Sequence, residues 1–185
     1  MNYYIGDLHF GHKNILKYDE SPFGTIEARD KYIIEKWKNK IKENDHVYIL
    51  GDVGCKNAEY TIECAEQLTG HLHLLVGNHD KKLLKQPKFV KLFDTIEKYD
   101  EIVDNGKHIV LCHYPIPCFN NHLIGWWHLY AHVHNSEEEF EMQLCRDALE
   151  KRFDKPCKMY NVGCMKVYMD YEPRTLIEIK NYFDE

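Results

Sequence analysis

The chain has 185 residues, of which 44% are hydrophobic and 29% are charged, and its formal net charge is −6. Residues 1–185 fit a single domain with a substantial core, and the negative charge disfavours bulk binding to nucleic acid. No apolar stretch approaches the roughly 20 residues that span a bilayer, so we expect no membrane partner. The first apolar run starts too early to leave room for a signal peptide. Seven cysteines without a C-x-x-C pair predict reduced thiols and a cytoplasmic protein.

The expected elements of the first half alternate between strand and helix, which indicates a layered α/β fold. Three short apolar runs, at 2–6, 46–50 and 71–76, are rich in β-branched and aromatic residues and are expected to be buried strands. Between them, residues 26–42 show the spacing of an amphipathic helix, and residues 58–69 predict a second helix.

A hairpin is expected after these elements. Residues 96–103 and 108–112 are expected to be two strands joined by Asp104-Asn105-Gly106-Lys107. An Asn-Gly pair between apolar runs is a strong hairpin signal. An antiparallel pair added to parallel strands predicts a mixed sheet or a second sheet.

Two helices are expected towards the end of the chain. Residues 136–153 predict one of them, and its acidic start, Glu137-Glu138-Glu139, is expected to be solvated because negative charge is favourable at a helix start. Thr175 followed three residues later by Glu178 is a capping-box pattern that opens a short final helix.

Five polar motifs each follow directly on an apolar run. They are Asp7-Leu8-His9, Asp52, Asn78-His79-Asp80, His113 and His132-Val133-His134. Ligands of an open α/β sheet gather at the carboxyl ends of its strands, so we expect these side chains to meet at one edge. Carboxylate, imidazole and carboxamide groups suit divalent ions such as Mn, Fe, Zn or Ni. The number of donors is enough for two ions, with Asp52 well placed to bridge them.

The expected charges favour an anionic substrate. Two divalent cations outweigh the carboxylates of Asp7 and Asp52 together with one bridging hydroxide, so the centre stays positive. Two metal ions roughly 3.5–4 Å apart clamp a transferring phosphoryl group and generate a hydroxide nucleophile at neutral pH. The donor set therefore predicts a centre that holds a phosphate ester.

The order of the motifs resembles the calcineurin-like metallophosphoesterase superfamily. The chain shows D-x-H at 7–9, G-D at 51–52, G-N-H-D at 77–80, a lone His113 and H-x-H at 132–134. The opening Asp-Leu-His-Phe-Gly-His-Lys-Asn-Ile and the later Asn-Val-Gly at 161–163 are similar to small prokaryotic and phage-type members. The resemblance implies an α/β fold, a four-layer sandwich of two mixed β-sheets flanked by helices.

The resemblance also implies a role for each motif residue. The first metal would be held by Asp7, His9 and His134. The second would be held by Asn78, His113 and His132, with Asp52 bridging both. The cofactors would be two divalent ions, with Mn as the first candidate and Fe, Zn or Ni as alternatives. His79 would act as general acid over the leaving group, and Asp80 would orient it.

The chain departs from the family pattern at three places. Ala131 stands where the family often has Gly before the H-x-H pair. Residues 53–56, after the G-D motif, contain no Arg, whereas the protein-phosphatase branch has a phosphate-holding Arg shortly after this point. Residues 135–160 look long for a minimal member and are expected to form a cap over the site or a contact surface.

Several alternatives stay open from the sequence. His12 either touches substrate near the start of a short helix or is a solvated or capping residue. Trp126 and Trp127 either form an aromatic wall for a nucleobase or belong to the core. We expect a phosphodiesterase that uses a metal-bridging hydroxide, with nucleotides among the candidate substrates. A phosphomonoesterase and a metal-binding scaffold without turnover are the alternatives.

Overall fold

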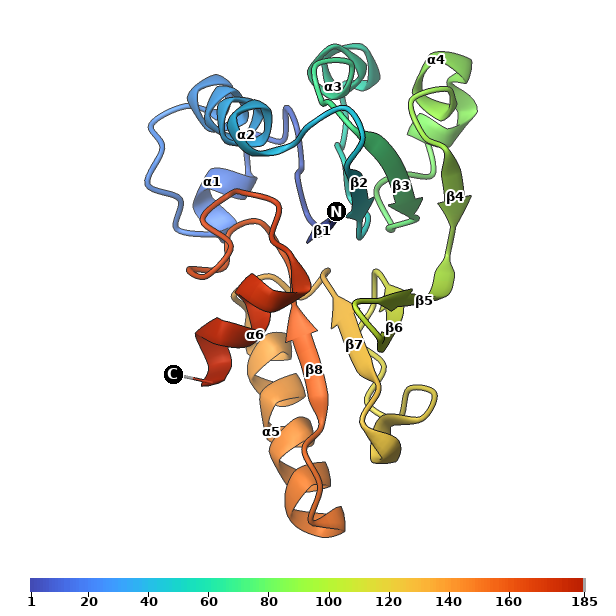
Figure 1. Ribbon diagram of the computed structural model, residues 1–185. Helices are drawn as coiled ribbons and strands as arrows, with labels where there is room; N and C mark the ends of the chain where they lie inside the picture. The colour runs from blue at the N-terminus through green and yellow to red at the C-terminus, as the bar shows by residue number, and fades with distance from the viewer. Residues whose placement is uncertain (185) are drawn as a thin grey trace.

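Two four-stranded sheets form the centre of the structure, a computed structural model that describes residues 1–184. The first sheet lies in the upper half of Figure 1 and the second in the lower half, and helices lie outside both. The predicted α/β fold with two sheets and flanking helices is confirmed. Among the described residues no helix is both long and apolar enough to cross a membrane.

The first sheet is parallel throughout its named strands, in the order β1-β2-β3-β4, so the expectation that both sheets are mixed is wrong for this one. Its strands are β1 (Asn2–Ile5), β2 (His46–Ile49), β3 (His71–Leu75) and β4 (Thr95–Glu97). The helices between them are α1 (Ile15–Tyr18), α2 (Ile26–Lys40), α3 (Ala58–Ala65), η1 (Leu83–Lys85) and α4 (Pro87–Val90). α2, α3 and α4 lie together on the outer side of this sheet (Figure 1). Consecutive parallel strands bring all their carboxyl ends to one edge.

The second sheet is the mixed one, in the order β5-β6-β7-β8. Its strands are β5 (Tyr99–Asp104), β6 (Lys107–Cys112), β7 (Trp127–Tyr130) and β8 (Lys158–Asn161). Only β5 and β6 pair antiparallel, and their turn places Asn105 and Gly106 at φ 48° and 73°, which confirms the predicted hairpin. The remaining helices are η2 (His122–Ile124), α5 (Glu137–Phe153) and α6 (Leu176–Asp184).

One predicted strand is wrong. Residues 96–103 were expected to be a single strand, but β4 ends at Glu97 in the first sheet and β5 begins at Tyr99 in the second. The chain changes sheets at Lys98 without a Gly, Pro or polar turn. An apolar pattern reports burial of side chains and carries no information about which neighbour a strand pairs with.

A single large hydrophobic cluster joins the two sheets. This cluster includes fully buried residues of both sheets, namely Tyr4 and Ile49 of the first and Leu111 and Leu129 of the second. This close packing fixes the position of the two sheets relative to each other, and with it the position of the loops at their edges. The predicted capping box is confirmed at the start of α6, where Glu178 N–H donates to Thr175 Oγ1 at 3.2 Å and Thr175 N–H donates to Glu178 Oε2 at 2.7 Å.

Candidate metal centre

The loops that follow β1, β2, β3, β6 and β7 converge at the junction of the two sheets. Backbone hydrogen bonds join the first two loops, since Asp7 N–H donates to Gly51 O at 3.1 Å and His9 N–H donates to Asp52 O at 2.8 Å. The loop after β7 joins them through His132 N–H, which lies 3.0 Å from Asp7 Oδ2. Hydrogen bonds of the backbone amides thus connect motifs that are far apart in the sequence.

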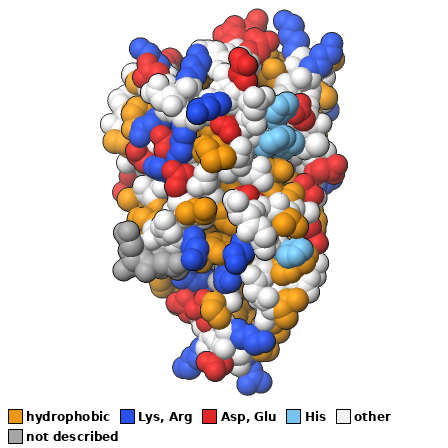
Figure 2. Space-filling view, in the orientation of Figure 1, with side chains coloured by type: hydrophobic (Ala, Val, Ile, Leu, Met, Phe, Trp, Pro, Cys, Tyr) orange, Lys and Arg blue, Asp and Glu red, His pale blue; other side chains and the backbone are white. Residues whose placement is uncertain are grey.

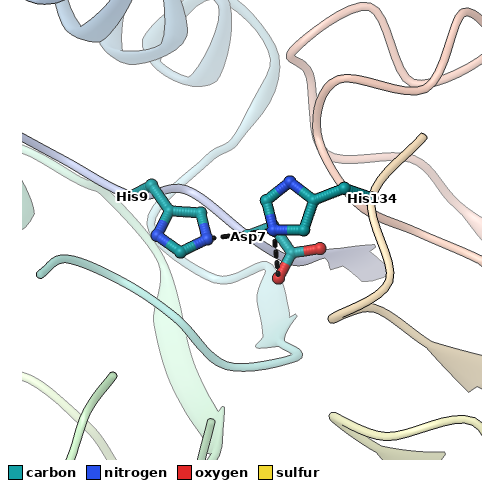
Figure 3. Close-up of side chains that lie close together, drawn as sticks. All are labelled: Asp7, His9 and His134. Carbon is teal, nitrogen blue, oxygen red and sulfur yellow. Dashed lines mark hydrogen bonds and ion pairs between the residues drawn. The ribbon is translucent and has the colours of Figure 1, made fainter. Parts of the chain in front are cut away.

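Asp7, His9 and His134 form one group of candidate ligands, and one ligand atom of each lies within 4.8 Å of the others. His9 Nε2 lies 3.2 Å from His134 Nε2, which lies 3.9 Å from Asp7 Oδ1. Figure 3 shows the three side chains turned towards a common point. Asp7 and His9 are buried.

Asp52, His113 and His132 form a second group within the same 4.8 Å limit. Asn78 belongs beside it, because its Oδ1 lies 3.1 Å from His113 Nε2. Asp52 stands between the two groups: its Oδ1 lies 3.7 Å from His113 Nε2, and its Oδ2 lies 3.6 Å from His9 Nε2. All seven side chains expected to bind metal are therefore brought together, with Asp52 between the two groups.

The backbone at these residues is strained. Asp7, His9, Asp52, His132 and His134 have φ values of 54°, 48°, 55°, 74° and 49°. Non-glycine residues rarely adopt this left-handed region, and they persist there mainly where the surrounding structure imposes it at functional sites. The residues in this conformation are the candidate ligands, whose side chains meet at the centre.

Two glycines make room for the candidate ligands. A Cβ atom at Gly77 would lie 2.2 Å from Asp52 Oδ1, and one at Gly51 would lie 2.4 Å from His113 Nδ1. A side chain at either position would displace a candidate ligand. Ala131, where the family often has Gly, is accommodated in the opposite way, because its Cβ occupies space that Gly6 leaves open.

Hydrogen bonds orient two of the imidazoles. His113 Nδ1 lies 2.7 Å from Leu50 O, and His134 Nδ1 lies 2.8 Å from Asp19 Oδ1. Both contacts require Nδ1 to carry the proton, which leaves Nε2 free to face the centre, as is usual for histidines that bind metal. Asp19 is buried and was not predicted as a site residue, because it lies in a loop without any motif.

Asp80 makes contacts other than the expected one to the His79 ring. The Asp80 carboxylate accepts hydrogen bonds from the backbone amides of Asp52, Val53 and Gly77 at 2.8–2.9 Å, so it holds the loops and does not bind the His79 ring. The physical reason is that buried amides of these loops need an acceptor. His79 Nε2 lies 3.9 Å from Asp52 Oδ2, and its Nδ1 lies 3.3 Å from Cys55 Sγ.

Burial shifts the pKa values of several candidate ligands towards their neutral forms. It raises the pKa of Asp7 to about 7, lowers that of His113 to about 4 and lowers that of His9. The pKa of Asp52 is also raised by burial. Burial acts in the same direction on His134, but the hydrogen bond to Asp19 and the nearby carboxylates outweigh it and raise the pKa of His134. These buried oxygen and nitrogen donors lack a compensating positive charge. Divalent cations supply that charge, so the residues fit two such ions.

A cleft of about 580 Å³ opens over the centre. It is lined by His9, His12, Asn14, Ile15, Tyr18, Cys55, Lys56, His79, His132, Val133, His134, Ser136 and Glu138. His12 is thus placed where it can meet a substrate, with its ring centroid 5.9 Å from that of His79. No Arg is among the lining residues described. On the face shown in Figure 2, basic and acidic side chains are interspersed.

The segment 135–160 contributes only its beginning to the cleft. Ser136 and Glu138 line it, whereas the rest of α5 runs alongside β8 and away from the first sheet (Figure 1). Glu139 was expected to be solvated with its neighbours, and this is wrong: it is buried and accepts a hydrogen bond from Asn161 Nδ2 at 2.9 Å. A buried polar partner on another element decided its placement.

The tryptophans lie outside the cleft. Trp127 is 3% exposed and belongs to the core, and Trp126 stacks on His108 with ring centroids 4.4 Å apart. The aromatic side chain that lines the cleft is Tyr18, which the sequence did not single out.

The match to known proteins agrees with this geometry. A family model described as calcineurin-like phosphoesterase matches residues 3–160. The chain belongs to this family. It is a metallophosphoesterase, a hydrolase that acts on phosphoester bonds, and the resemblance inferred from its motifs is confirmed.

Relatives from an archaeon, a phage and a bacterium are similar to it. Uncharacterized protein MJ1445 of Methanocaldococcus jannaschii is 35% identical over 139 residues, which are 74% of this metallophosphoesterase and 72% of the relative. The Gene 66 protein of Mycobacterium phage D29 is 24% identical over 160 residues, 78% of this chain and 72% of its own. A protein of unknown function from Aquifex aeolicus has a solved structure with a TM-score of 0.72, 26% identity and 98% coverage of both chains.

Proposed function

We propose that this metallophosphoesterase hydrolyses phosphodiesters at a centre of two divalent ions. The observation that carries the proposal is the position of Asp52, which has one carboxylate oxygen 3.7 Å from His113 Nε2 and the other 3.6 Å from His9 Nε2. Asp7, His9 and His134 would hold one ion, and Asn78, His113 and His132 the other. Such ions supply Lewis acidity towards phosphoryl oxygens and a water nucleophile at neutral pH.

His79 is the proton donor in this proposal. Its side chain is 35% exposed and lines the cleft, so it can reach a substrate that lies over the centre. Cys55 Sγ lies 3.3 Å from Nδ1 and helps to fix the orientation of the ring. The protonated ring carries a proton on both nitrogens, so it can act as the acid and return to the neutral form. From Nε2 the proton passes to the departing oxygen.

Diesters are favoured over monoesters by the charge of the cleft. A monoester carries one more negative charge than a diester, and enzymes that hold it commonly use Arg. Among the described residues, the lining of the cleft includes Lys56 and no Arg. Mn is the proposed metal, with Fe, Zn or Ni as alternatives. A cytoplasmic location and a nucleotide-like substrate stay predictions.

Hydrolysis of bis-p-nitrophenyl phosphate and p-nitrophenyl phosphate, measured with added Mn, tests the proposal. We expect a higher kcat/KM for the diester. A clear preference for the monoester would make the protein a phosphomonoesterase instead.

The variant His79→Ala tests the proton donor. We expect turnover of the diester to fall by about 10²–10⁴-fold, as for a lost general acid, while elemental analysis still finds the metal content of the unchanged protein. Unreduced turnover in this variant would remove His79 from the mechanism.

A further inference from the structure

A second, smaller pocket adjoins the metal centre. Its volume is about 380 Å³, and it is lined by Tyr114, Pro115, His132, Val133, Glu138, Glu141 and Met142. It shares His132, Val133 and Glu138 with the main cleft. The two depressions therefore meet at His132, one of the candidate metal ligands, and a molecule centred there can extend into both.

Tyr114 forms the aromatic wall of this pocket. It directly follows His113, and its ring packs edgewise on two imidazoles of the centre, with centroids 4.9 Å from that of His113 and 4.6 Å from that of His132. It is still 43% exposed, so part of the ring is free for a ligand. Met142, on the second turn of α5, supplies a polarisable apolar wall that also suits aromatic rings.

The charges of the two depressions differ. Glu141 lines only the smaller pocket, Glu138 lines both depressions, and Lys56 lines only the main cleft. Among the described residues, the lining of the smaller pocket includes no Lys or Arg. Carboxylates repel a further phosphate group and accept hydrogen bonds from ring N–H or amino groups. The smaller pocket thus favours an uncharged or amine-bearing ring.

The position of His79 distinguishes the two arms of a diester. His79 lines the main cleft and is not among the residues that line the smaller pocket. In hydrolysis, a water oxygen forms a new bond to phosphorus, the bond to the departing oxygen breaks, and that oxygen takes a proton from the general acid; a water proton later restores the acid. The departing group must therefore lie beside His79, in the main cleft.

We propose that the pocket at Tyr114 binds the organic group that stays on the phosphate, and that this group is a planar ring without a further phosphate. The inference rests on the proposed phosphodiesterase function and names the substrate class of the same site. The segment after His134, whose role the sequence left open, supplies Glu138, Glu141 and Met142 to this pocket.

Two diesters with the same leaving group test the proposal, namely phenyl p-nitrophenyl phosphate and methyl p-nitrophenyl phosphate. They differ only in the retained group. We expect the ratio of their kcat/KM values to favour the phenyl ester, and Tyr114→Ala to reduce this ratio about 2–10-fold through the lost ring contact. Tyr114→Phe keeps the ring and should keep the ratio.

Tyr18→Ala is the matched control, because Tyr18 is also an exposed tyrosine beside the centre but lines the main cleft. In Tyr18→Ala, the phenyl-to-methyl ratio should stay within about twofold of its value in the unchanged protein. Calorimetric binding of phenylphosphonate and methylphosphonate to the Mn-loaded protein gives a readout without turnover. In this measurement, Tyr114→Ala should weaken the binding of phenylphosphonate relative to that of methylphosphonate by a similar factor.

An unchanged phenyl-to-methyl ratio in Tyr114→Ala, or an equal loss in Tyr18→Ala, would overturn the assignment while leaving the phosphodiesterase function intact. If the unchanged protein hydrolyses p-nitrophenyl phosphate but neither diester, the proposed function itself fails and the assignment fails with it.

Discussion

At the scale of the residue, Gly77 leaves room for the Asp52 carboxylate. A Cβ atom there would lie 2.2 Å from Asp52 Oδ1, a distance that real Cβ atoms do not reach, so Asp52 must move. We expect Gly77→Ala to reduce bound metal per chain and to lower diester hydrolysis by about 10–100-fold. Elemental analysis and the bis-p-nitrophenyl phosphate assay measure both effects.

Gly24→Ala is the control for this substitution, because no atom lies within 4 Å of a Cβ built at Gly24. It should change neither metal content nor rate. Full metal content in Gly77→Ala would show that the loop adapts and that Gly77 is not needed for the site.

His128 predicts a pH dependence of stability. It is buried, with Nδ1 3.1 Å from Val110 O, and its Nε2 accepts a hydrogen bond from Ile116 N–H at 3.0 Å. If Nε2 also carried a proton, it would point at the Ile116 N–H and could no longer accept this hydrogen bond. Burial lowers the pKa of His128 from 6.5 to about 4. The unfolded chain therefore binds more protons between these values, and stability present above about pH 6.5 is lost as the pH falls towards 4.

Urea unfolding of the metal-free protein between pH 7 and pH 4 measures this effect. His128→Gln removes the titrating group, so the free energy of unfolding should depend less on pH in the variant. As the pH falls from 7 to 4, the free energy of unfolding of the unchanged protein should fall relative to that of the variant by at most roughly 3 kcal/mol. A constant difference at every pH would contradict the prediction.

At the scale of the element, α5 presents one buried carboxylate to the second sheet. Glu139 is 6% exposed and accepts hydrogen bonds from Asn161 Nδ2 at 2.9 Å and from Tyr130 Oη at 3.2 Å. Lys166 Nζ lies 3.5 Å from it. Removal of the carboxylate would leave these buried partners unsatisfied.

We expect Glu139→Ala to lower the free energy of unfolding by about 2–4 kcal/mol, measured by urea denaturation. Glu137→Ala is the control, because Glu137 is exposed in the first turn of the same helix and its loss should cost less than about 1 kcal/mol. Equal effects of the two substitutions would show that Glu139 does not anchor the helix.

The elements also show what local patterns predict. The hairpin at Asn105-Gly106 and the capping box at Thr175 depend on neighbouring residues, so both were predictable. The change of sheet at Lys98 and the burial of Glu139 depend on partners far along the chain, so neither was.

At the scale of the whole molecule, we expect metal binding to stabilise the fold. Ligand groups from both sheets converge there, and burial shifts the pKa values of Asp7 and Asp52 upwards in the absence of a cation. Metal that binds only the folded protein stabilises it by mass action, by about 2.7 kcal/mol at a concentration 100 times Kd. We expect Tm to rise by about 5–10 °C with Mn relative to chelator.

Differential scanning calorimetry with elemental analysis of the same samples measures this shift. Equal Tm values in Mn and in chelator, with metal loss verified, would contradict this expectation.

By itself, the sequence determined the family, the strands that precede each motif and the identity of the candidate ligands, because apolar runs and donor types are local properties. Only the tertiary structure decided that Asp80 binds backbone amides, that Asp19 orients His134 and that Tyr114 lines a second pocket. These contacts join residues whose meeting depends on how two sheets pack. Packing is set by the sum of many burial terms across the core, and no short pattern encodes that sum.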